Sequence, residues 1–206
     1  MDEAVLIMLA LRLLAPLLIL RFPLIGILLC AGIDVVDYSF MGSMADYQLL
    51  DKLLDTYYLG FAAITVFRWK DVWARRIVLG AYIWRLIGVI LVFATDQRWL
   101  LMVFPNFFEM FFIFYLLFIH ISKHTKLVTS GAITSLIIAV LLIPKLVQEY
   151  VLHIYQPSPQ TAPGWTTYII EHFAWAALPL ALLPPLVVLA YCIWQARFAK
   201  QRRGEK

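Results

Sequence analysis

Long apolar runs, separated by short polar breaks, make up almost the whole chain. A membrane-spanning helix needs roughly 20 apolar residues, and most of the runs are about that long. Only helices and closed barrels satisfy their backbone hydrogen bonds in lipid, so uninterrupted runs of this length predict helices. We expect seven of them, at about residues 4–20, 22–40, 48–67, 77–95, 99–121, 127–152 and 167–195.

Composition supports a membrane protein. Of the 206 residues, 63% are hydrophobic and only 15% are charged, which is more apolar surface than a soluble domain needs. This length leaves room for about six or seven spans and little else. We therefore expect an all-α, polytopic helix bundle that forms a single transmembrane domain over residues 1–206. The net charge of +4 is modest, and we expect no nucleic-acid partner.

Lysine and arginine are unequally divided between the two sides of the predicted bundle. One side holds twelve of them and the other holds three, while Arg12 and Arg85 lie inside spans. Because basic residues favour the cytoplasmic side, the loop at 68–76 and the C-terminus should be cytoplasmic. The basic side holds Arg21, Arg68, Lys70, Arg75, Arg76, Lys123, Lys126, Arg197, Lys200, Arg202, Arg203 and Lys206; the other has Lys52, Arg98 and Lys145.

Four carboxylates stand where the second run ends and the third begins. Asp34 and Asp37 are three residues apart, and Asp51 and Asp55 are four apart. These spacings put each pair on one helix face, and a short turn would bring the two pairs together. Ionisable groups within a membrane protein are costly and mark functional sites by default.

Four carboxylates at close range repel one another, and partial protonation or a bound divalent cation would relieve the repulsion. Carboxylate oxygens suit hard cations, so we expect Mg²⁺ or Mn²⁺ at this cluster. The alternative is that these aspartates cap helices and stay solvated at the membrane interface.

Three other polar residues are candidates for substrate binding. Arg85 lies near the middle of the fourth run, where it could hold a phosphate or pair with a carboxylate of a neighbouring helix. Asn106 and Glu109 share one helix face in the fifth run, and Glu109 could add a fifth carboxylate to the cluster.

The aspartate pairs belong to a pattern that resembles a known family. ALRLLAPLLIL at 10–20, DVVD at 34–37, DKLLD at 51–55 and then Arg85 look like the CDP-alcohol phosphatidyltransferases, over about residues 8–90. The family signature is D-x2-D-G-x2-A-R followed by G-x3-D-x3-D, on two consecutive membrane helices.

The resemblance implies roles for the four carboxylates. Asp34, Asp37 and Asp51 match the metal-binding aspartates of the family. Asp55 matches the last aspartate, which helps to hold metal and acts as general base on the acceptor alcohol. The signature's two glycines fall on tyrosines, at 38 and 47, and its Ala-Arg pair falls on Met41-Gly42. Paired aspartates also mark the UbiA-type prenyltransferases, which have more spans than fit here.

Two hypotheses follow for the function. The first is a divalent-metal-dependent transferase acting on a lipid-phosphate or CDP-alcohol-like substrate, with Asp55 as its catalytic residue. The second is a non-catalytic membrane protein that binds lipid or cation, assists a partner, or passes an ion through a polar cavity. The retained aspartates favour the first, and the missing glycines and arginine favour the second. Membrane lipid is the expected partner in either case, and a homodimer remains an alternative.

Overall fold

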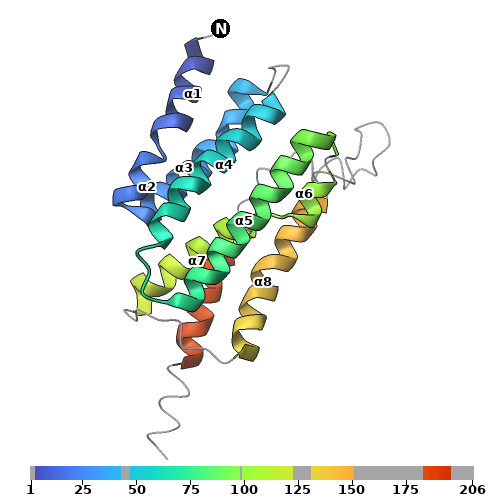
Figure 1. The fold of residues 1–206 in the computed structure, drawn as a ribbon. Coiled ribbons are helices and arrows are strands. Elements are labelled where there is room, and N and C mark those ends of the chain that lie inside the picture. Colours follow the sequence, from blue (N-terminus) through green and yellow to red (C-terminus); the bar gives the residue numbers. More distant parts are fainter. Residues whose placement is uncertain (1–2, 43–46, 98, 123–130, 151–182, 196–206) are drawn as a thin grey trace, which may run out of the picture.

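The computed structural model describes residues 3–42, 47–97, 99–122, 131–150 and 183–195. These residues form helices and contain no strand, which confirms the all-α prediction (Figure 1). Within the described residues, three helical stretches are long and apolar enough to cross a membrane, namely Glu3–Arg21, Val72–Thr95 and Leu100–Ile121.

The helices follow the apolar runs of the sequence in order. They are α1 (Glu3–Leu14), α2 (Leu17–Arg21), α3 (Pro23–Met41), α4 (Tyr47–Val66), α5 (Val72–Thr95), α6 (Leu100–Val103), α7 (Phe107–Ser122) and α8 (Gly131–Tyr150). A further helical segment covers Leu183–Gln195. Most of the seventh expected span and the C-terminal tail lie outside the described residues.

Proline divides two of the expected runs into two helices each. Pro16 stands between α1 and α2. Pro105 follows Phe104, the C-cap residue of α6, and α7 begins at Phe107, two residues after Pro105. Proline lacks a backbone N–H and disfavours helical geometry in the residue before it. The expectation of one continuous helix at 99–121 was therefore wrong in this respect.

α5, the helix of the fourth apolar run, begins at Val72, five residues before that run. Asp71 caps α5, because its Oδ1 accepts hydrogen bonds from the backbone nitrogens of Trp73 (3.0 Å) and Ala74 (3.1 Å). Arg75 and Arg76 therefore lie in the first turns of α5, and the basic segment expected as a loop at 68–76 is partly helical. Hydropathy did not reveal this start because the first turns of α5 carry charged residues.

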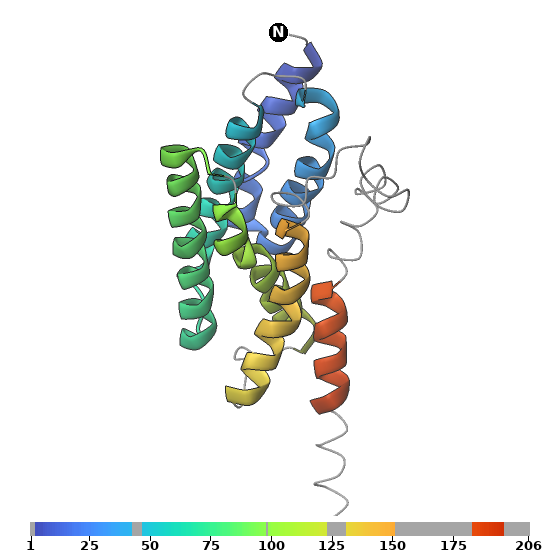
Figure 2. The same ribbon diagram turned by 90° about the vertical axis from the view of Figure 1, so that its right-hand side faces the viewer.

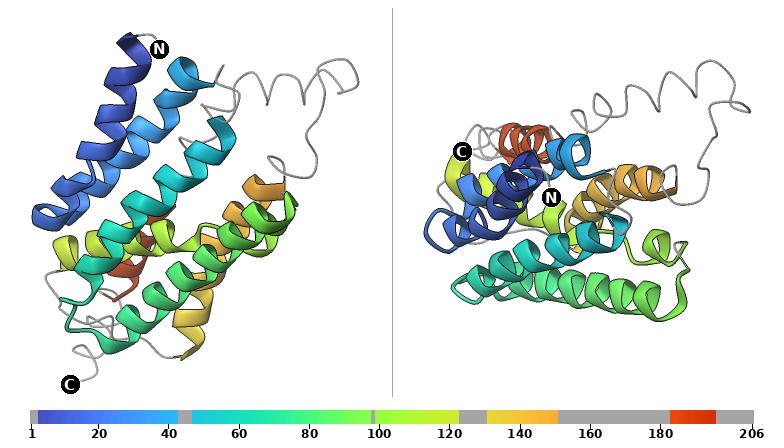
Figure 3. Two further views of the ribbon diagram at one scale, coloured as in Figure 1. Left: turned by 45° about the horizontal axis from the view of Figure 1, so that its top comes forward. Right: turned by 90° about the horizontal axis from the view of Figure 1, so that it is seen from above.

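α1, α2, α3 and α4 pack together, and α4 also packs along α5 (Figures 2 and 3). Gly26 allows the start of α3 to lie directly against α2, since a Cβ atom there would come within 2.5 Å of the Ile19 backbone nitrogen. This contact turns α3 back along α1. The aspartates in the second half of α3 are thereby placed next to α1.

α7 is the central helix of the described bundle. Its aromatic side chains are fully buried at several positions around the helix, and it packs against α3, α4, α5 and α8. Trp69, from the α4–α5 connection, stacks on Tyr115 with ring centroids 4.1 Å apart. A helix that is apolar on all sides is expected in the interior of a bundle. The fully buried aromatic residues of α7 are Phe108, Phe111, Phe112, Phe114, Tyr115 and Phe118.

Candidate functional site

All four aspartates of α3 and α4 converge on the guanidinium group of Arg12 in α1. Arg12 Nη1 donates to Asp34 Oδ1 and lies 3.2 Å from Asp37 Oδ2. Arg12 Nη2 lies 3.3 Å from Asp51 Oδ1 and 3.2 Å from Asp55 Oδ1. The structure thus brings the two pairs together, as their helical spacing predicts, and places a cationic side chain between them.

Arg12 belongs to the buried face of α1. Val5, Met8 and Arg12 follow one another at spacings of three and four, and all three are buried. The Arg12 side chain is only 3% exposed, and the side chain of Asp37 is completely buried. The apolar stripe that packs α1 on α3 therefore also carries the arginine into the interior.

Lys52 and Tyr47, both on α4, complete the surroundings of the carboxylates. Lys52 Nζ lies 2.7 Å from Asp51 Oδ2 and 3.8 Å from Asp55 Oδ2. The Tyr47 hydroxyl donates to Asp37 Oδ1 at 2.6 Å, so a tyrosine at a signature glycine position binds one of the aspartates. We call Arg12, Lys52 and the four aspartates the aspartate–arginine centre. Its four carboxylates face two cations, which leaves an excess of two negative charges when all groups are ionised.

The centre contains polar atoms that its ion pairs do not fully satisfy. Among the described residues, Asp37 Oδ2 and Arg12 Nε are buried and have no hydrogen-bond partner. Asp34, Asp37 and Asp51 each offer a carboxylate oxygen, and these atoms lie within 4.8 Å of one another. Such a donor set fits a hard divalent cation such as Mg²⁺ or Mn²⁺. Arg12 contacts the same three carboxylates, so a cation would compete with it.

Arg85 is buried and donates a hydrogen bond to a backbone carbonyl. Its Nη1 donates to the carbonyl oxygen of Phe104 at 2.9 Å. Pro105 interrupts the helix at this point, so the carbonyl of Phe104, which is partly buried, takes its donor from a side chain. Of the two roles that the sequence allowed for Arg85, phosphate binding remains a proposal, and the contact seen here is to backbone rather than to a carboxylate.

Asn106 and Glu109 form a second polar group at the start of α7. Asn106 Nδ2 donates to Glu109 Oε2 at 3.0 Å, and the buried Asn106 Oδ1 has no hydrogen-bond partner among the described residues. The electrostatic neighbours of Glu109 include Asp55 and Tyr58 of α4 and Lys145 of α8. The pair therefore lies beside the aspartate–arginine centre, toward α8.

Sequence reasoning missed Arg12 and Lys52 as members of the site. From the sequence, Arg12 is only a charge within a predicted span. An arginine in an apolar run needs an anionic partner, and the carboxylates of the next two runs were available. That signal was present in the sequence, but only the packing of α1 on α3 and α4 shows that Arg12 contacts all four aspartates.

Comparison of the chain with protein-family models, curated proteins and solved structures finds no match. The resemblance to the CDP-alcohol phosphatidyltransferases therefore stays a prediction from the residues of the motif. The geometry of the aspartate–arginine centre is the basis for a functional proposal.

Proposed function

We propose that the protein is a membrane transferase that uses Mg²⁺ or Mn²⁺ and acts on a lipid-phosphate or CDP-alcohol-like substrate. The observation that supports this best is the grouping of Asp34, Asp37 and Asp51, whose oxygens lie within 4.8 Å of one another. The excess of two negative charges in the centre matches one divalent cation. A bound cation would supply charge neutralisation for a phosphate group, which is the main demand of phosphoryl-type chemistry.

The residues of the chain itself would bind the substrate and move the proton. Asp55 is the proposed general base, which accepts the proton of an acceptor hydroxyl. Arg12 Nη2 lies 3.2 Å from Asp55 Oδ1 and Lys52 Nζ lies 3.8 Å from its Oδ2, so both cations orient this carboxylate. Arg85 and the Asn106–Glu109 pair are the proposed substrate-binding residues beside the centre.

A thermal-unfolding experiment in detergent tests the cation site. Millimolar Mg²⁺ or Mn²⁺ should raise the Tm of the wild type above its value in chelator, because a ligand of the folded state stabilises that state. The gain is about 2.7 kcal/mol at a cation concentration one hundred times the Kd. Asp37→Asn or Asp51→Asn should abolish the rise, and Asp55→Asn should weaken it less. Asp96→Asn is the matched control, because Asp96 is exposed and outside the centre.

Two results would contradict the cation proposal. One is an identical Tm for the wild type in chelator and in millimolar cation. The other is an equal rise in the Asp37→Asn variant and the wild type. Either result would exclude a cation at the centre, and with it the proposed metal-dependent reaction.

A second candidate function is favoured by the position of Arg12. Its guanidinium contacts all four carboxylates and so takes the place that a cation would have. A centre neutralised in this way suits a non-catalytic protein that binds lipid, passes an ion or assists a partner, including a second copy of the chain. The response of Arg12 variants to cations separates the two functions.

We also propose that the basic end of α5 and the C-terminus are cytoplasmic. α5 offers a direct test, because Val72 and Asp96 mark its two ends and both are exposed. In a background without Cys30 and Cys192, a membrane-impermeant thiol reagent should label Asp96→Cys in intact cells and leave Val72→Cys unlabelled until the membrane is opened. The reverse pattern would invert the proposed orientation.

A further inference from the structure

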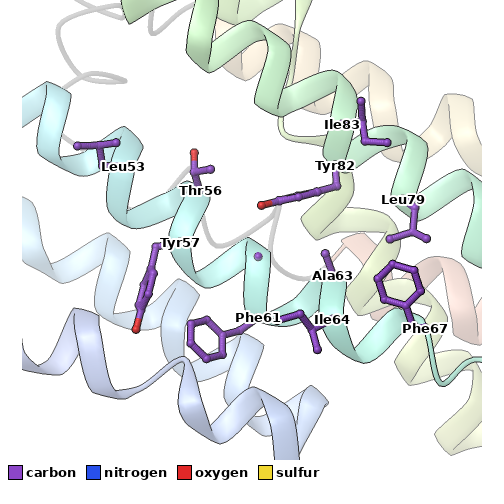
Figure 4. A pocket seen from close by; sticks show the side chains of 11 residues that line it. Leu53, Thr56, Tyr57, Phe61, Ala63, Ile64, Phe67, Leu79, Tyr82 and Ile83 are labelled. Atoms are coloured by element: carbon purple, nitrogen blue, oxygen red, sulfur yellow. The ribbon is translucent and has the colours of Figure 1, made fainter.

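A groove with a volume of about 720 Å³ runs along α4 where α4 lies beside α5 (Figure 4). From Leu53 to Phe67 it extends over about 21 Å of helix at 1.5 Å per residue. That is a large part of the roughly 30 Å hydrocarbon layer of a bilayer. The lining is apolar apart from the hydroxyls of Thr56, Tyr57 and Tyr82.

One of these hydroxyls points into the groove without a partner. Tyr82 Oη is directed into the groove (Figure 4). A Cβ atom added at Gly60, on the α4 side, would lie 3.2 Å from this oxygen. Among the described residues, this hydroxyl has no hydrogen-bond acceptor. Thr56 and Tyr57, by contrast, donate to the backbone carbonyls of Lys52 and Leu13. A hydroxyl in apolar surroundings is costly unless it is bonded, so the groove favours an occupant that brings an acceptor.

The chemistry of the occupant follows from this acceptor. A transmembrane helix already uses its backbone carbonyls within itself, so it has few acceptors to offer in the hydrocarbon layer. An acyl ester combines a hydrocarbon chain with a free carbonyl oxygen. The hydrocarbon chain fits the apolar lining between Phe61 and Phe67, and the carbonyl oxygen fits the hydroxyl of Tyr82.

The polar end of the groove leads to the aspartate–arginine centre. Gly60 and Lys52 are eight residues apart on α4, a distance of about 12 Å along the helix. Thr56 lies between them and belongs to the groove lining. The head group of a lipid whose ester lies at Tyr82 would therefore extend toward Lys52 and the carboxylates.

We propose that this groove binds one acyl chain of a bilayer glycerophospholipid, with its ester carbonyl accepting from Tyr82 Oη and its phosphate directed toward Lys52. That this lipid is also the substrate rests on the proposed function, whereas its binding does not.

Photolabelling in lipid vesicles tests the proposal. The probe is a phosphatidic acid with a diazirine on one ester-linked acyl chain, in phosphatidylcholine vesicles that contain the full-length protein. Mass spectrometry should locate the label in 53–67 and 79–83. Tyr82→Phe should lower this labelling about threefold to tenfold through the lost hydrogen bond. Gly60→Leu, which fills the groove, should lower it about tenfold.

Two controls make the test specific. Gly32→Leu adds the same side chain to an exposed position of α3 where a Cβ atom meets nothing within 4 Å, and it should leave the labelling unchanged. An ether-linked analogue of the probe has no ester carbonyl. Its labelling should be weaker in the wild type and should not respond to Tyr82→Phe.

Labelling spread evenly over α3 and α5, and unchanged in Gly60→Leu, would overturn the proposal in favour of unspecific bilayer lipid. Absence of lipid label from 53–67 and 79–83 in the wild type would overturn it as well, because a protein segment or a second copy that covers the groove would exclude the lipid. The two proposals can fail separately. Loss of the cation-dependent Tm rise removes the metal-dependent function and leaves lipid labelling unaffected, while loss of the labelling leaves the Tm rise in place.

Discussion

Arg12→Gln is expected to destabilise the protein by about 3–5 kcal/mol, since removal of one partner of a buried ion pair leaves the other charges uncompensated. In this variant Lys52 alone would face four carboxylates, with the excess negative charge rising from two to three. The loss should be visible as a lower Tm in detergent. The Tm of Arg12→Lys should lie between those of the wild type and Arg12→Gln. A lysine keeps the charge but lacks the two guanidinium nitrogens that reach both aspartate pairs.

Arg21→Gln provides the control for this experiment. Arg21 lies at the exposed end of α2, outside the aspartate–arginine centre. A surface change of this kind is expected to alter stability by about 0.5 kcal/mol or less. If Arg12→Gln were no less stable than Arg21→Gln in chelator, Arg12 would not be the counter-charge on which the four carboxylates depend.

The second large effect is a partial rescue of Arg12→Gln by divalent cation. Arg12 and a cation would share the oxygens of Asp34, Asp37 and Asp51, so removal of Arg12 should free these oxygens and strengthen cation binding. Mg²⁺ or Mn²⁺ should then raise the Tm of Arg12→Gln more than that of the wild type. A tenfold tighter Kd corresponds to about 1.4 kcal/mol of added stabilisation at saturating cation.

Two variants and the wild type define the outcome of the rescue experiment. Arg12→Gln combined with Asp37→Asn should show little rescue, because it lacks a ligand. A Tm rise of equal size in the wild type and Arg12→Gln would mean that the cation binds elsewhere. No rise in either protein would leave Arg12 and Lys52 as the cationic partners of the carboxylates, and the non-catalytic function would then be the better account.

Hydrophobic patterning determined most of the helical structure of this protein. The first six apolar runs predict where α1 to α8 lie, although not the breaks at Pro16 and Pro105, because runs of this length form helices in lipid, where the backbone must be satisfied internally. Spacings of three and four likewise predict that Asp34 and Asp37 share one face and that Asp51 and Asp55 share another. These features depend on residues close together in the chain, so they can be read without knowledge of the fold.

Tertiary structure alone decided which charges meet. Arg12 is 22 residues from Asp34 and 43 from Asp55, and only the packing of α1 against α3 and α4 brings them within bonding distance. The sequence predicts the cluster of four carboxylates, and the fold adds Arg12 and Lys52 as its internal cations; the divalent cation stays a prediction. The groove beside Tyr82 has the same origin, because α4 and α5 each contribute one wall. Helical periodicity determines the face on which a side chain lies, but the partner of that face is set by packing between segments distant in the chain.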